Sequence, residues 1–530
     1  MGERINISRH EAWVTDDLGN IIGVVGPAGK KQYFYGQPDQ ADSDELIASL
    51  GPSLTGKRLY LAPATYTISA LIQATLSRCE IIGVPGLTKI AGNFATDAGG
   101  GTINAGLLRL LECSGVRFYG ITFENTFSSA LLDTGQGVVY SYQSNITDVE
   151  FERCEFTAPN CGTNGPSFYP RINTTDTSAA IDGLRIIRCH IHDIGRVGCT
   201  FMQRNTAAGA ELSCKGVVFS ENRVSNLGLV DPNGIGVSLD GNGVGRFDDN
   251  EFANCRGIGI ENTGWTRTRV VGNRARDFRS GRAWSFMSWS VQGGRRISRN
   301  VIAENLCLEA GNQRNNFIGL DDCRFSDNVF QTSADEYAVH VRDSNRNKFS
   351  RDQYISANAG AVVVGTNTTT TQGNEWTDCV ADNSANGAVG TLVLFDGAST
   401  TDNVWRRGDL KKGTGGSYTG TSNSAVYELE DVALDGVRRF GYRIINMSDA
   451  NITLSEHNAQ SRYLRFSGTL TAGRTAFFPN VDRNYVIHNS TGQTLTLDVG
   501  GVTTTVAAGV KATISWQKTS STWYNFGVMT

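Results

Sequence analysis

The sequence lacks the features that would place a protein in a membrane, on an export pathway or on nucleic acid. No apolar run reaches the roughly 18 residues that a membrane-spanning helix needs. The first residues, Met1–His10, have no apolar core of the kind found in signal peptides, so we expect no export signal. The formal net charge is only −4, which gives no overall attraction to nucleic acid or to an anionic membrane. We therefore expect no nucleic-acid partner and no membrane partner.

Cysteine pairing and the common cofactor motifs are also missing. The 11 cysteines show no paired spacing and no Cys-x-x-Cys, so we interpret them as buried thiols of a protein made in a reducing cytosol. No Walker, Rossmann or serine-hydrolase motif occurs in a supporting context. His190 and His192 have the spacing of two ligands on one face of a strand, but the sequence shows no remote partner for them. We expect no cofactor and no metal.

What the sequence does contain is a repeat that returns about every 28 residues. Each unit has an apolar strand with alternating polarity, then a small or amide residue, then another apolar pair, as in Val116–Phe123 and Val217–Val224. The alternation indicates strands rather than helices. The small or amide residue, which we name the pivot, falls at Gly120, Cys154, Cys189, Asn222, Asn250, Asn273, Asn300, Asn328, Asp352, Cys379 and Arg407.

A repeat of strands predicts a solenoid. One coil cannot bury its apolar face alone, whereas stacked coils bury it together. We therefore predict an all-β protein, a right-handed parallel β-helix that is a single-stranded solenoid, with a small N-terminal β element and a C-terminal antiparallel β-domain. Asparagines at one coil bend can bond to the asparagines above and below. Cysteine fits the same position as a small buried residue.

The composition along the chain predicts four segments. Residues 1–42 form an N-terminal attachment or cap element, and residues 43–412 form the β-helix with a glycan groove. A capped helix is expected at Ser43–Leu50, where it would cover the first coil. Residues 413–427 are rich in Gly, Ser and Thr and are expected to be a linker. Residues 428–530 are expected to form a β-domain, since Thr494–Val499 and Val502–Val506 alternate as antiparallel strands do. The resemblance described next implies that this domain serves trimerisation or distal binding.

Two stretches carry a family resemblance. Between Ser43 and Gly92, the expected helix, a Leu-Tyr-Leu-Ala-Pro turn and an Ile-Ile-Gly-x-Pro-Gly strand resemble the start of pectate-lyase-like β-helices. Near the end, Phe477–Val481, Tyr485–Gly492 and Trp523 resemble the terminal β-domain of phage tail fibres and tailspikes. Together these parts resemble phage tailspike or tail fibre depolymerases.

The resemblance implies partners and a location. Such a protein would be a homotrimer in the virion tail, attached through its N-terminus to a phage baseplate or tail protein. It would be made in the bacterial cytosol and would act at the host cell surface. Its target would be a bacterial surface polysaccharide, namely a capsule, an exopolysaccharide or an O-antigen.

Acids recur on the strand that precedes each pivot strand. If Val237, Leu239 and their equivalents point inward, the outward stack contains Ser238 with Asp240, Gly259 with Glu261, a Trp289–Ser290 rung, Gly319 with Asp321, and His340 with Arg342. Glu261 and Asp321 would then lie two rungs apart, roughly 9–10 Å, near the spacing of an inverting glycosidase. Asp240 and Glu261 would lie about 5 Å apart, the spacing of a retaining enzyme. We predict Glu261 and Asp321 as the catalytic pair, with Asp240 next.

The surrounding residues predict a binding surface for a glycan. Arginines are interspersed with Trp265, Trp284 and Trp289 over residues 265–299, a combination that suits an acidic polysaccharide. Asp321 and Asp322, with the basic rung after them, resemble polygalacturonases in part. The expected substrate-binding residues are Asp322, His340, Arg342, Trp289, Trp265 and Arg267.

Three functions fit this pattern. The first is hydrolysis of the polysaccharide by paired carboxylates. The second is a receptor-binding fibre without enzymatic activity. The third is a lyase that acts on a uronate-containing glycan, with His340 or Arg342 as the base.

Overall fold

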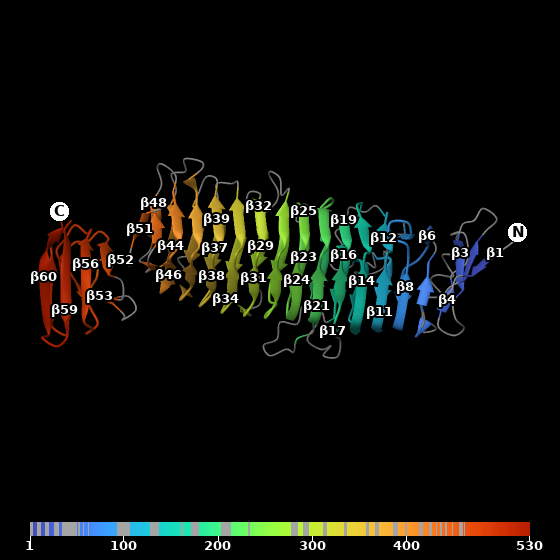
Figure 1. Ribbon diagram of the computed structural model, residues 1–530, viewed down its shortest axis with the longest axis horizontal. Helices are drawn as coiled ribbons and strands as arrows, with labels where there is room; N and C mark the ends of the chain where they lie inside the picture. The colour runs from blue at the N-terminus through green and yellow to red at the C-terminus, as the bar shows by residue number, and fades with distance from the viewer. Residues whose placement is uncertain are drawn as a thin grey trace. The chain divides into compact units, whose positions relative to one another are not determined.

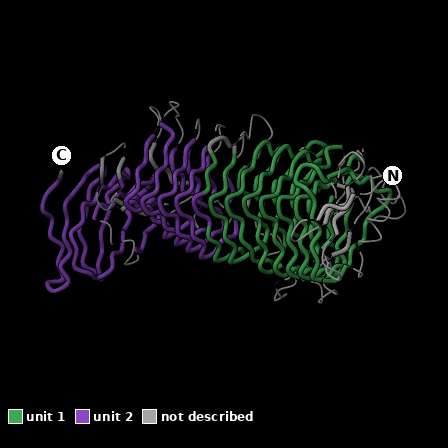
Figure 2. The backbone as a smooth tube through the Cα atoms, turned by 45° about the vertical axis from the view of Figure 1, so that its right-hand side comes forward, with its two compact units in different colours: residues 1–301, 305–311 green, residues 302–304, 312–530 purple. Residues whose placement is uncertain are grey.

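The chain winds through three strand directions in turn, and each strand pairs in parallel with its counterpart in the next coil, which makes a right-handed parallel β-helix (Figure 1). The computed structural model describes residues 4–7, 12–15, 21–25, 31–33, 50, 54–56, 58–61, 63–92, 106–127, 137–160, 162, 164–170, 180–202, 212, 214–231, 234–276, 285–289, 296–310, 315–332, 337–356, 360–365, 370–384, 391–397, 400–412, 417–422, 427–430, 432–434, 437–439, 442–447, 449–454, 459 and 462–529. Two compact units divide the chain, residues 1–301 with 305–311 and residues 302–304 with 312–530 (Figure 2).

The first unit contains three parallel sheets. Sheet 1 consists of β4 (Lys31–Tyr33), β5 (Arg58–Tyr60), β8 (Ser77–Ile82), β11 (Cys113–Tyr119), β14 (Ile146–Glu152), β17 (Ile181–Asp182), β18 (Arg185–Ile187), β21 (Cys214–Ser220), β24 (Gly243–Asp248) and β27 (Arg269–Val271). Sheet 2 consists of β6 (Thr65–Ile68), β9 (Lys89–Gly92), β12 (Thr122–Asn125), β15 (Glu155–Ala158), β19 (His190–Ile194), β22 (Arg223–Leu227), β25 (Glu251–Cys255), β28 (Arg274–Arg276) and β32 (Leu306–Ala310). Sheet 3 consists of β7 (Ile72–Ala74), β10 (Leu108–Leu110), β13 (Gly137–Tyr142), β16 (Asn164–Tyr169), β20 (Cys199–Met202), β23 (Ile235–Asp240), β26 (Ile258–Asn262) and β29 (Ser285–Trp289).

The second unit repeats the same three directions. Its sheets contain β35 (Arg324–Ser326), β38 (Lys348–Ser350), β42 (Glu375–Thr377), β46 (Asn403–Arg406) and β49 (Tyr427–Glu430); β36 (Val329–Thr332), β39 (Gln353–Ser356), β43 (Val380–Asp382), β47 (Asp409–Lys411) and β50 (Val432–Leu434); and β33 (Asn315–Ile318), β37 (Val339–Arg342), β40 (Val362–Gly365), β44 (Thr391–Asp396) and β48 (Ser417–Ser422). Short strands lie at the bends: β30 (Ile297–Ser298), β34 (Leu320–Asp321), β41 (Thr371–Gln372) and β45 (Thr400–Thr401). Strand β31 (Val301–Ala303) lies where the two units divide.

The coils extend past both predicted boundaries. Strand β4 already pairs in parallel with β5, so the β-helix begins before residue 43. Residues 413–427, predicted as a linker, contain β48, which pairs in parallel with β44. The linker prediction is wrong here because backbone hydrogen bonds hold this strand, and a Gly, Ser and Thr composition does not prevent them. Parallel coils continue to β50. The helix expected at Ser43–Leu50 lies outside the described residues, apart from the buried Leu50.

The two ends of the chain differ from the coils. At the start, β1 (Arg4–Ile7), β2 (Ala12–Thr15) and β3 (Ile21–Val25) form the expected small antiparallel sheet. The final part contains β51 (Val437–Arg439), β52 (Tyr442–Asn446), β53 (Ile452–Thr453), β54 (Tyr463–Ser467), β55 (Arg474–Phe477), β56 (Arg483–Asn489), β57 (Leu495–Val499), β58 (Val502–Val506), β59 (Lys511–Gln517) and β60 (Thr522–Met529). Its first strands, β51 and β52, pair antiparallel with β50 and β49. Parallel pairing follows from β52 through β54 to β56, and the last strands pair antiparallel again. The described part of the chain holds no helix long and apolar enough to cross a membrane.

Aromatic side chains stack from coil to coil inside the solenoid. In the first unit, Phe118 and Phe151 lie with their ring centroids 4.8 Å apart and nearly parallel. In the second unit, Phe349 stacks on Trp376 at 4.8 Å. Such stacking follows from the parallel register, which places the same position of each coil directly above the last.

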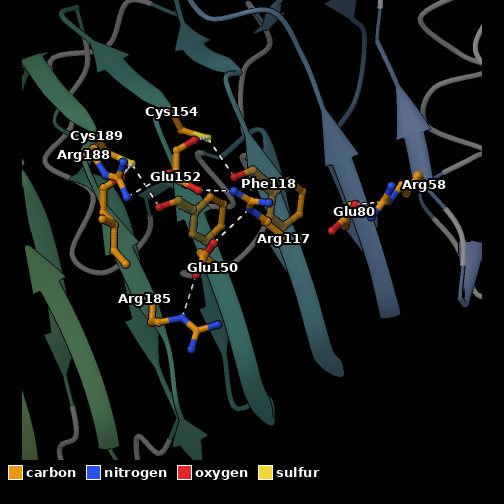
Figure 3. A network of polar contacts seen from close by, with 12 residues as sticks. Arg58, Glu80, Arg117, Phe118, Glu150, Glu152, Cys154, Arg185, Arg188 and Cys189 are labelled. Atoms are coloured by element: carbon orange, nitrogen blue, oxygen red, sulfur yellow. Dashed lines mark hydrogen bonds and ion pairs between the residues drawn. The ribbon is translucent and has the colours of Figure 1, made fainter. Parts of the chain in front are cut away.

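Asparagine ladders hold the bends between sheets 1 and 2. The amide of Asn222 donates to Asn250 at 3.0 Å, that of Asn250 to Asn273 at 2.9 Å, and that of Asn273 to Asn305 at 2.9 Å. Each amide also donates to a carbonyl of the preceding coil. Below the ladder, the thiols of Cys154 and Cys189 face the equivalent carbonyls (Figure 3). The predicted ladder and the free, buried cysteines are therefore confirmed for the described residues.

Two of the predicted pivots belong elsewhere. The fourth amide of the ladder is Asn305 rather than Asn300, which instead accepts a hydrogen bond from the backbone N–H of Thr268 at 2.7 Å at another bend. The pivot before β47 is Gly408, not Arg407, which lies in a left-handed turn with φ 49° and pairs with Asp378. The repeat length varies between coils, so counting along the sequence shifts the register by a few residues.

We expect Asn250→Ala to destabilise the first unit by about 3 kcal/mol, because buried polar groups that lose their partners cost roughly 1–3 kcal/mol each. Asn250 both donates hydrogen bonds to ladder partners and accepts hydrogen bonds from them, so the substitution leaves several buried polar groups without that partner. The matched control is Asn254→Ala, whose amide bonds Asn226 on the exposed surface; it should cost under about 1 kcal/mol. Urea unfolding measures both, and equal losses would contradict a stabilising role for the buried ladder.

We expect Asp352→Asn to stabilise the protein above neutral pH. Asp352 occupies a pivot position and accepts two hydrogen bonds from Asn328, both at 2.8 Å. Burial raises its pKa to about 7 from an ordinary value of 3.8. Because the folded-state pKa is raised, the neutral acid favours folding at low pH, and this contribution is lost as the pH rises from about 4 to beyond 7.

Thermal unfolding at about pH 5 and about pH 8.5 tests this expectation, since those values lie on either side of the titration. The variant should unfold at a higher temperature than the natural chain only at the higher pH. The exposed Asp402→Asn is the control and should show no such difference. An equal shift of the Asp352 variant at both pH values would rule out the titration as its cause.

Candidate functional site

Two acids of the outer face of sheet 3 lie on neighbouring strands in the first unit. The register pairs Ser238 of β23 with Glu261 of β26. The backbone N–H of Thr263 donates to the carbonyl of Leu239 at 2.8 Å, which places Thr263 beside Asp240. Leu239 is fully buried in the core, so the alternating residues on either side of it face outward.

Each carboxylate has a hydroxyl partner on the other strand. The Ser238 hydroxyl donates to Glu261 Oε2 at 2.9 Å, and the Thr263 hydroxyl donates to Asp240 Oδ1 at 2.6 Å. Burial raises the pKa of Glu261, and the nearby Asp240 raises it further, whereas the Ser238 hydrogen bond lowers it. Glu261 therefore holds its proton to higher pH than an ordinary glutamate does.

The two acids are diagonal neighbours. Glu261 is level with Ser238, while Asp240 lies two residues further along β23. A strand spacing of about 4.8 Å combined with two residues of about 3.3 Å each places their Cα atoms roughly 8 Å apart. The prediction assumed that the acids face each other directly, and that register is wrong, because Ser238 is the residue opposite Glu261. The Asp240 carboxylate is still near enough to raise the pKa of Glu261.

A tight turn after β26 fixes Thr263 in place. The side chain of Asn262 is fully buried and accepts hydrogen bonds from the backbone N–H groups of Gly264 and Trp265, at 3.0 and 2.8 Å. A Cβ at Gly264 would meet the carbonyl oxygen of Gly241 at 2.0 Å, so only glycine allows this approach. The turn therefore holds the hydroxyl that orients Asp240.

The outer face of sheet 1 has a different character. Its acids are paired across coils, as Glu150 is with Arg117 at 3.0 Å and with Arg185 at 2.8 Å (Figure 3). Within the described parts of the chain, by contrast, neither Asp240 nor Glu261 forms an ion pair. On sheet 1, acids such as Glu150 pair with arginines on neighbouring strands. On sheet 3, the carboxylates of Asp240 and Glu261 can instead be used by a ligand.

Comparison with known proteins identifies the fold of the chain. No family model and no curated protein sequence matches the chain. Among solved structures, the N-terminal fragment of gene product 12 of bacteriophage Phi29 aligns with a TM-score of 0.55 and 11% identity, over 93% of this chain and 94% of the fragment. Tailspike protein 3 of bacteriophage CBA120 aligns with a TM-score of 0.54 and 11% identity, over 94% of this chain and 68% of that protein. The chain has the fold of bacteriophage tailspike proteins.

In this tailspike fold, the two rows of sheet 3 that contain the acids continue through the preceding coils, along residues that the sequence did not reveal. Along the same outer row, register connects Glu261 through Ser238, Thr200 and Ser167 to Tyr140. The parallel row through Asp240 includes Met202, and it continues with Tyr169 and Tyr142. Of the two tyrosines of this row, Tyr142 keeps a half-exposed ring while Tyr169 is buried. The alternation of Tyr140 and Tyr142 along β13 was a signal that could have identified this row.

The predicted tryptophans face the core of the tailspike fold instead of the outer surface. Trp289 pairs in register with the buried Asn262 and is itself fully buried, so Ser288 is level with Glu261. Trp265 is fully buried, with its ring centroid 5.8 Å from that of Phe201. The prediction that these rings contact a sugar is wrong, because both rings are buried. For Trp289 the cause is a rung that was expected one residue away, which changes the face of every side chain on the strand.

The glycine expected beside Glu261 also faces the core. A Cβ on Gly259 would meet the ring of Phe286 at 2.7 Å, and one on Gly236 would meet Phe252 at 2.7 Å. Both Gly236 and the next residue, Val237, are buried, so the strict alternation fails at the start of β23. The predicted trough of small residues is therefore not the surface beside the acids.

Asp321 does not lie on the strand on which it was predicted. Asp321 lies on β34 in the second unit, after a turn at Gly319 with φ 75°, and it bridges to Asn345. The residue paired with His340 is Asn316, and Ile318 pairs with Arg342. Phe317 rather than Ile318 is buried in β33. The predicted stack of Asp321 over His340 and Arg342 is thus wrong, because the chain turns a corner between Ile318 and Leu320.

The remaining predicted binding residues have other surroundings. His340 is buried, and its Nε2 lies 3.3 Å from the carbonyl of Gly365. Arg342, at the end of the same strand, is half-exposed. Asp322 lies in a turn and forms a two-bond ion pair with Arg346, at 2.9 and 3.1 Å. Arg267 is exposed in the turn that leads to β27, on sheet 1 rather than sheet 3. Among the described residues predicted for the site, Asp240 and Glu261 are the acids that lie on neighbouring strands, and the indole N–H of Trp265 donates to the backbone carbonyl of Asp240 at 3.4 Å.

This arrangement suits acid–base chemistry. A carboxyl of raised pKa, such as that of Glu261, can donate a proton to a leaving oxygen, and a neighbouring carboxylate can accept one from water. Thr263 occupies Oδ1 of Asp240, which leaves Oδ2 for that water. The pair alone supplies both roles of an inverting hydrolysis.

Proposed function

We propose that this chain is a tailspike that recognises a bacterial surface polysaccharide and hydrolyses it. The observation that supports hydrolysis is the pairing of a half-buried, hydroxyl-bonded Glu261 of raised pKa with Asp240 on the next strand. The fold shared with tailspike protein 3 of bacteriophage CBA120 supports the virion tail as the location. The antiparallel sheet β1–β3 is the proposed attachment point to a baseplate or tail protein.

In the proposed mechanism, Glu261 is the general acid and Asp240 the general base. Glu261 gives its proton to the glycosidic oxygen as the bond to the anomeric carbon breaks. Asp240 accepts a proton from the water that forms the new bond on the opposite face of the sugar. Asp240 thereby takes the place that the sequence assigned to Asp321, because Asp240 is the acid on the strand beside Glu261.

Two other functions compete with this one. A receptor-binding fibre would use the same face, including the ring of Tyr142, without cleaving the glycan. A lyase would need an accessible base, and the buried His340 offers a poor one. Product analysis separates the three functions: new reducing ends indicate hydrolysis, an unsaturated uronate indicates elimination, and bound intact glycan indicates an adhesin.

Glu261→Gln and Asp240→Asn should each lower the rate of cleavage by about 10²–10⁴, the usual contribution of a general acid or base. The substrate for the assay is any capsule, exopolysaccharide or O-antigen preparation that the natural chain cleaves, followed by mass spectrometry. Asp182→Asn, an exposed acid of sheet 1, is the matched control and should keep full activity. If Asp321→Asn abolishes cleavage and Asp240→Asn does not, the assignment of the base is wrong.

The pH profile should respond to Ser238→Ala. Glu261 must be protonated to act as the acid, so activity falls as the pH rises through its pKa. The Ser238 hydrogen bond lowers that pKa, so its removal should shift the alkaline limb of the profile to higher pH. If the alkaline limb stays at the same pH in the variant, or moves to lower pH, then Glu261 is not the group whose titration limits activity.

We further propose that three copies associate through the C-terminal part. Strand β60 presents Tyr524, Phe526 and Val528 at alternate positions, with 40%, 67% and 62% of each exposed. Such a row on the last strand of a sheet marks an interaction surface, and a second copy of the same chain provides a matching one.

Phe526→Asp should therefore convert the proposed trimer to smaller species in sedimentation velocity. Leu87→Asp is the matched control, because Leu87 is exposed to a similar degree, 61%, in a turn of the first unit. The control variant should sediment as the natural chain does. A monomeric natural chain, or equal dissociation of both variants, would refute this assembly.

A further inference from the structure

A cluster of two histidines and a glutamate lies on the outer face of sheet 2, away from the acid pair on sheet 3. Glu155 of β15 and His190 of β19 are paired in register across neighbouring coils. His192 lies two residues beyond His190 and so faces the same side. One ligand atom from each of the three residues lies within 4.8 Å of the other two. We propose that this cluster is a binding site for a divalent transition-metal ion.

The distances suit a metal after small side-chain rotations. Glu155 Oε1 lies 2.6 Å from His192 Nε2 and 3.9 Å from His190 Nδ1. Ligand atoms that bind one zinc ion at about 2.1 Å in a tetrahedral arrangement are roughly 3.4 Å apart. The two observed distances lie on either side of that value. The imidazole rings stack with centroids 4.0 Å apart, so both turn their nitrogens toward the same carboxylate.

Neighbouring groups hold the three ligands in orientation. The Thr122 hydroxyl donates to Glu155 Oε2 at 2.7 Å, which leaves Oε1 toward the histidines. Asp193 Oδ2 lies 2.8 Å from His192 Nδ1, and the other oxygen of Asp193 accepts a hydrogen bond from Asn226 at 3.0 Å. A carboxylate on the far nitrogen of a metal-binding histidine fixes its tautomer and raises its basicity. The cluster thus has outer partners of the kind that metal sites have.

A backbone irregularity brings these groups together. The register between β15 and β19 shifts between Phe156 and Ala158, so β19 carries one extra residue there. At this bulge Asp193 adopts a left-handed conformation, with φ 50°. Bulges redirect side chains, and this one turns the Asp193 carboxylate toward His192.

The protonation states of the three ligands determine how strongly protons compete with a metal ion for the ligand atoms. Burial lowers the pKa of His190 to about 4, with His192 and Arg223 adding to the effect, so His190 is neutral and ready to bind near neutral pH. Burial lowers the pKa of His192 too, but its bonds to Glu155 and Asp193 outweigh burial and raise it overall. The His192 hydrogen bond is the main cause that lowers the pKa of Glu155 to about 2. Imidazole binds a metal ion only in its deprotonated form, so affinity should increase with pH.

The ligand chemistry limits the metal and its role. Two imidazoles and one carboxylate suit zinc, cobalt, nickel or iron(II) rather than calcium or magnesium. The half-exposed cluster leaves the remaining coordination positions to water. Since the ligands come from two successive coils, a bound ion would link these coils and stabilise the folded chain.

Zinc titration of the untagged full chain by isothermal calorimetry tests the site. We expect one zinc ion per chain, weaker binding at lower pH, and a higher unfolding temperature with zinc. Cobalt(II), used as a second probe, should give visible absorption bands of a nitrogen- and oxygen-bound ion. The double variant His190→Asn with His192→Asn should lose the calorimetric signal and the cobalt bands.

Graded variants separate a built site from adventitious binding. Asp193→Asn should weaken zinc binding about 10–100-fold, as expected for a group that orients a ligand. His488→Asn removes a half-buried histidine in the C-terminal part, bonded to Tyr463, and should leave zinc binding unchanged. Circular dichroism verifies that each variant is folded. The proposal fails if the natural chain binds no zinc, or if the double variant binds it as well as the natural chain does.

Discussion

The parallel hydrogen bonding between successive coils is the constraint on which the rest of the structure depends. Once each strand lies in register above its predecessor, residues that are 23 to 39 positions apart in sequence become neighbours, as in the bonds from Ser238 to Glu261 and from Cys113 to Ala74. The asparagine ladder reinforces that register at the bend, because its amides bond both to one another and to backbone carbonyls. A side chain that suits one position of a coil therefore also suits the same position of the next coil.

The three outer faces use the same geometry for different purposes. On sheet 1, opposite charges alternate between coils and neutralise one another, as Arg185 does with Glu150. On sheet 3, two acids on adjacent strands each accept a hydrogen bond from a hydroxyl, and burial together with the nearby Asp240 raises the pKa of Glu261. On sheet 2, a bulge gathers histidines around Glu155. The residues that stabilise the fold and the residues proposed to carry chemistry thus lie on different outer faces, while the backbone geometry is the same on all three.

The repeat and its pivots made the fold class predictable from the sequence. Alternating apolar residues and recurring asparagines at Asn222, Asn250 and Asn273 permit few arrangements other than a stacked coil. The exact level of each residue was less predictable, because the coils differ in length and turn corners. A shift of one residue moved Trp289 from the expected surface into the core, and the corner at Gly319 separated Asp321 from the strand of His340.

The sequence by itself determined that this chain is a wound column of β-strands with a distinct β element at each end, since apolar periodicity is a local property that survives errors in register. Only the tertiary structure decided which acids share a face, because that depends on where each corner falls. It kept Asp240 on the strand beside Glu261, it placed Asp321 on a different strand, and it supplied Glu155 as the remote partner that His190 and His192 lacked in the sequence. Contacts between coils are long-range, and no local pattern encodes them.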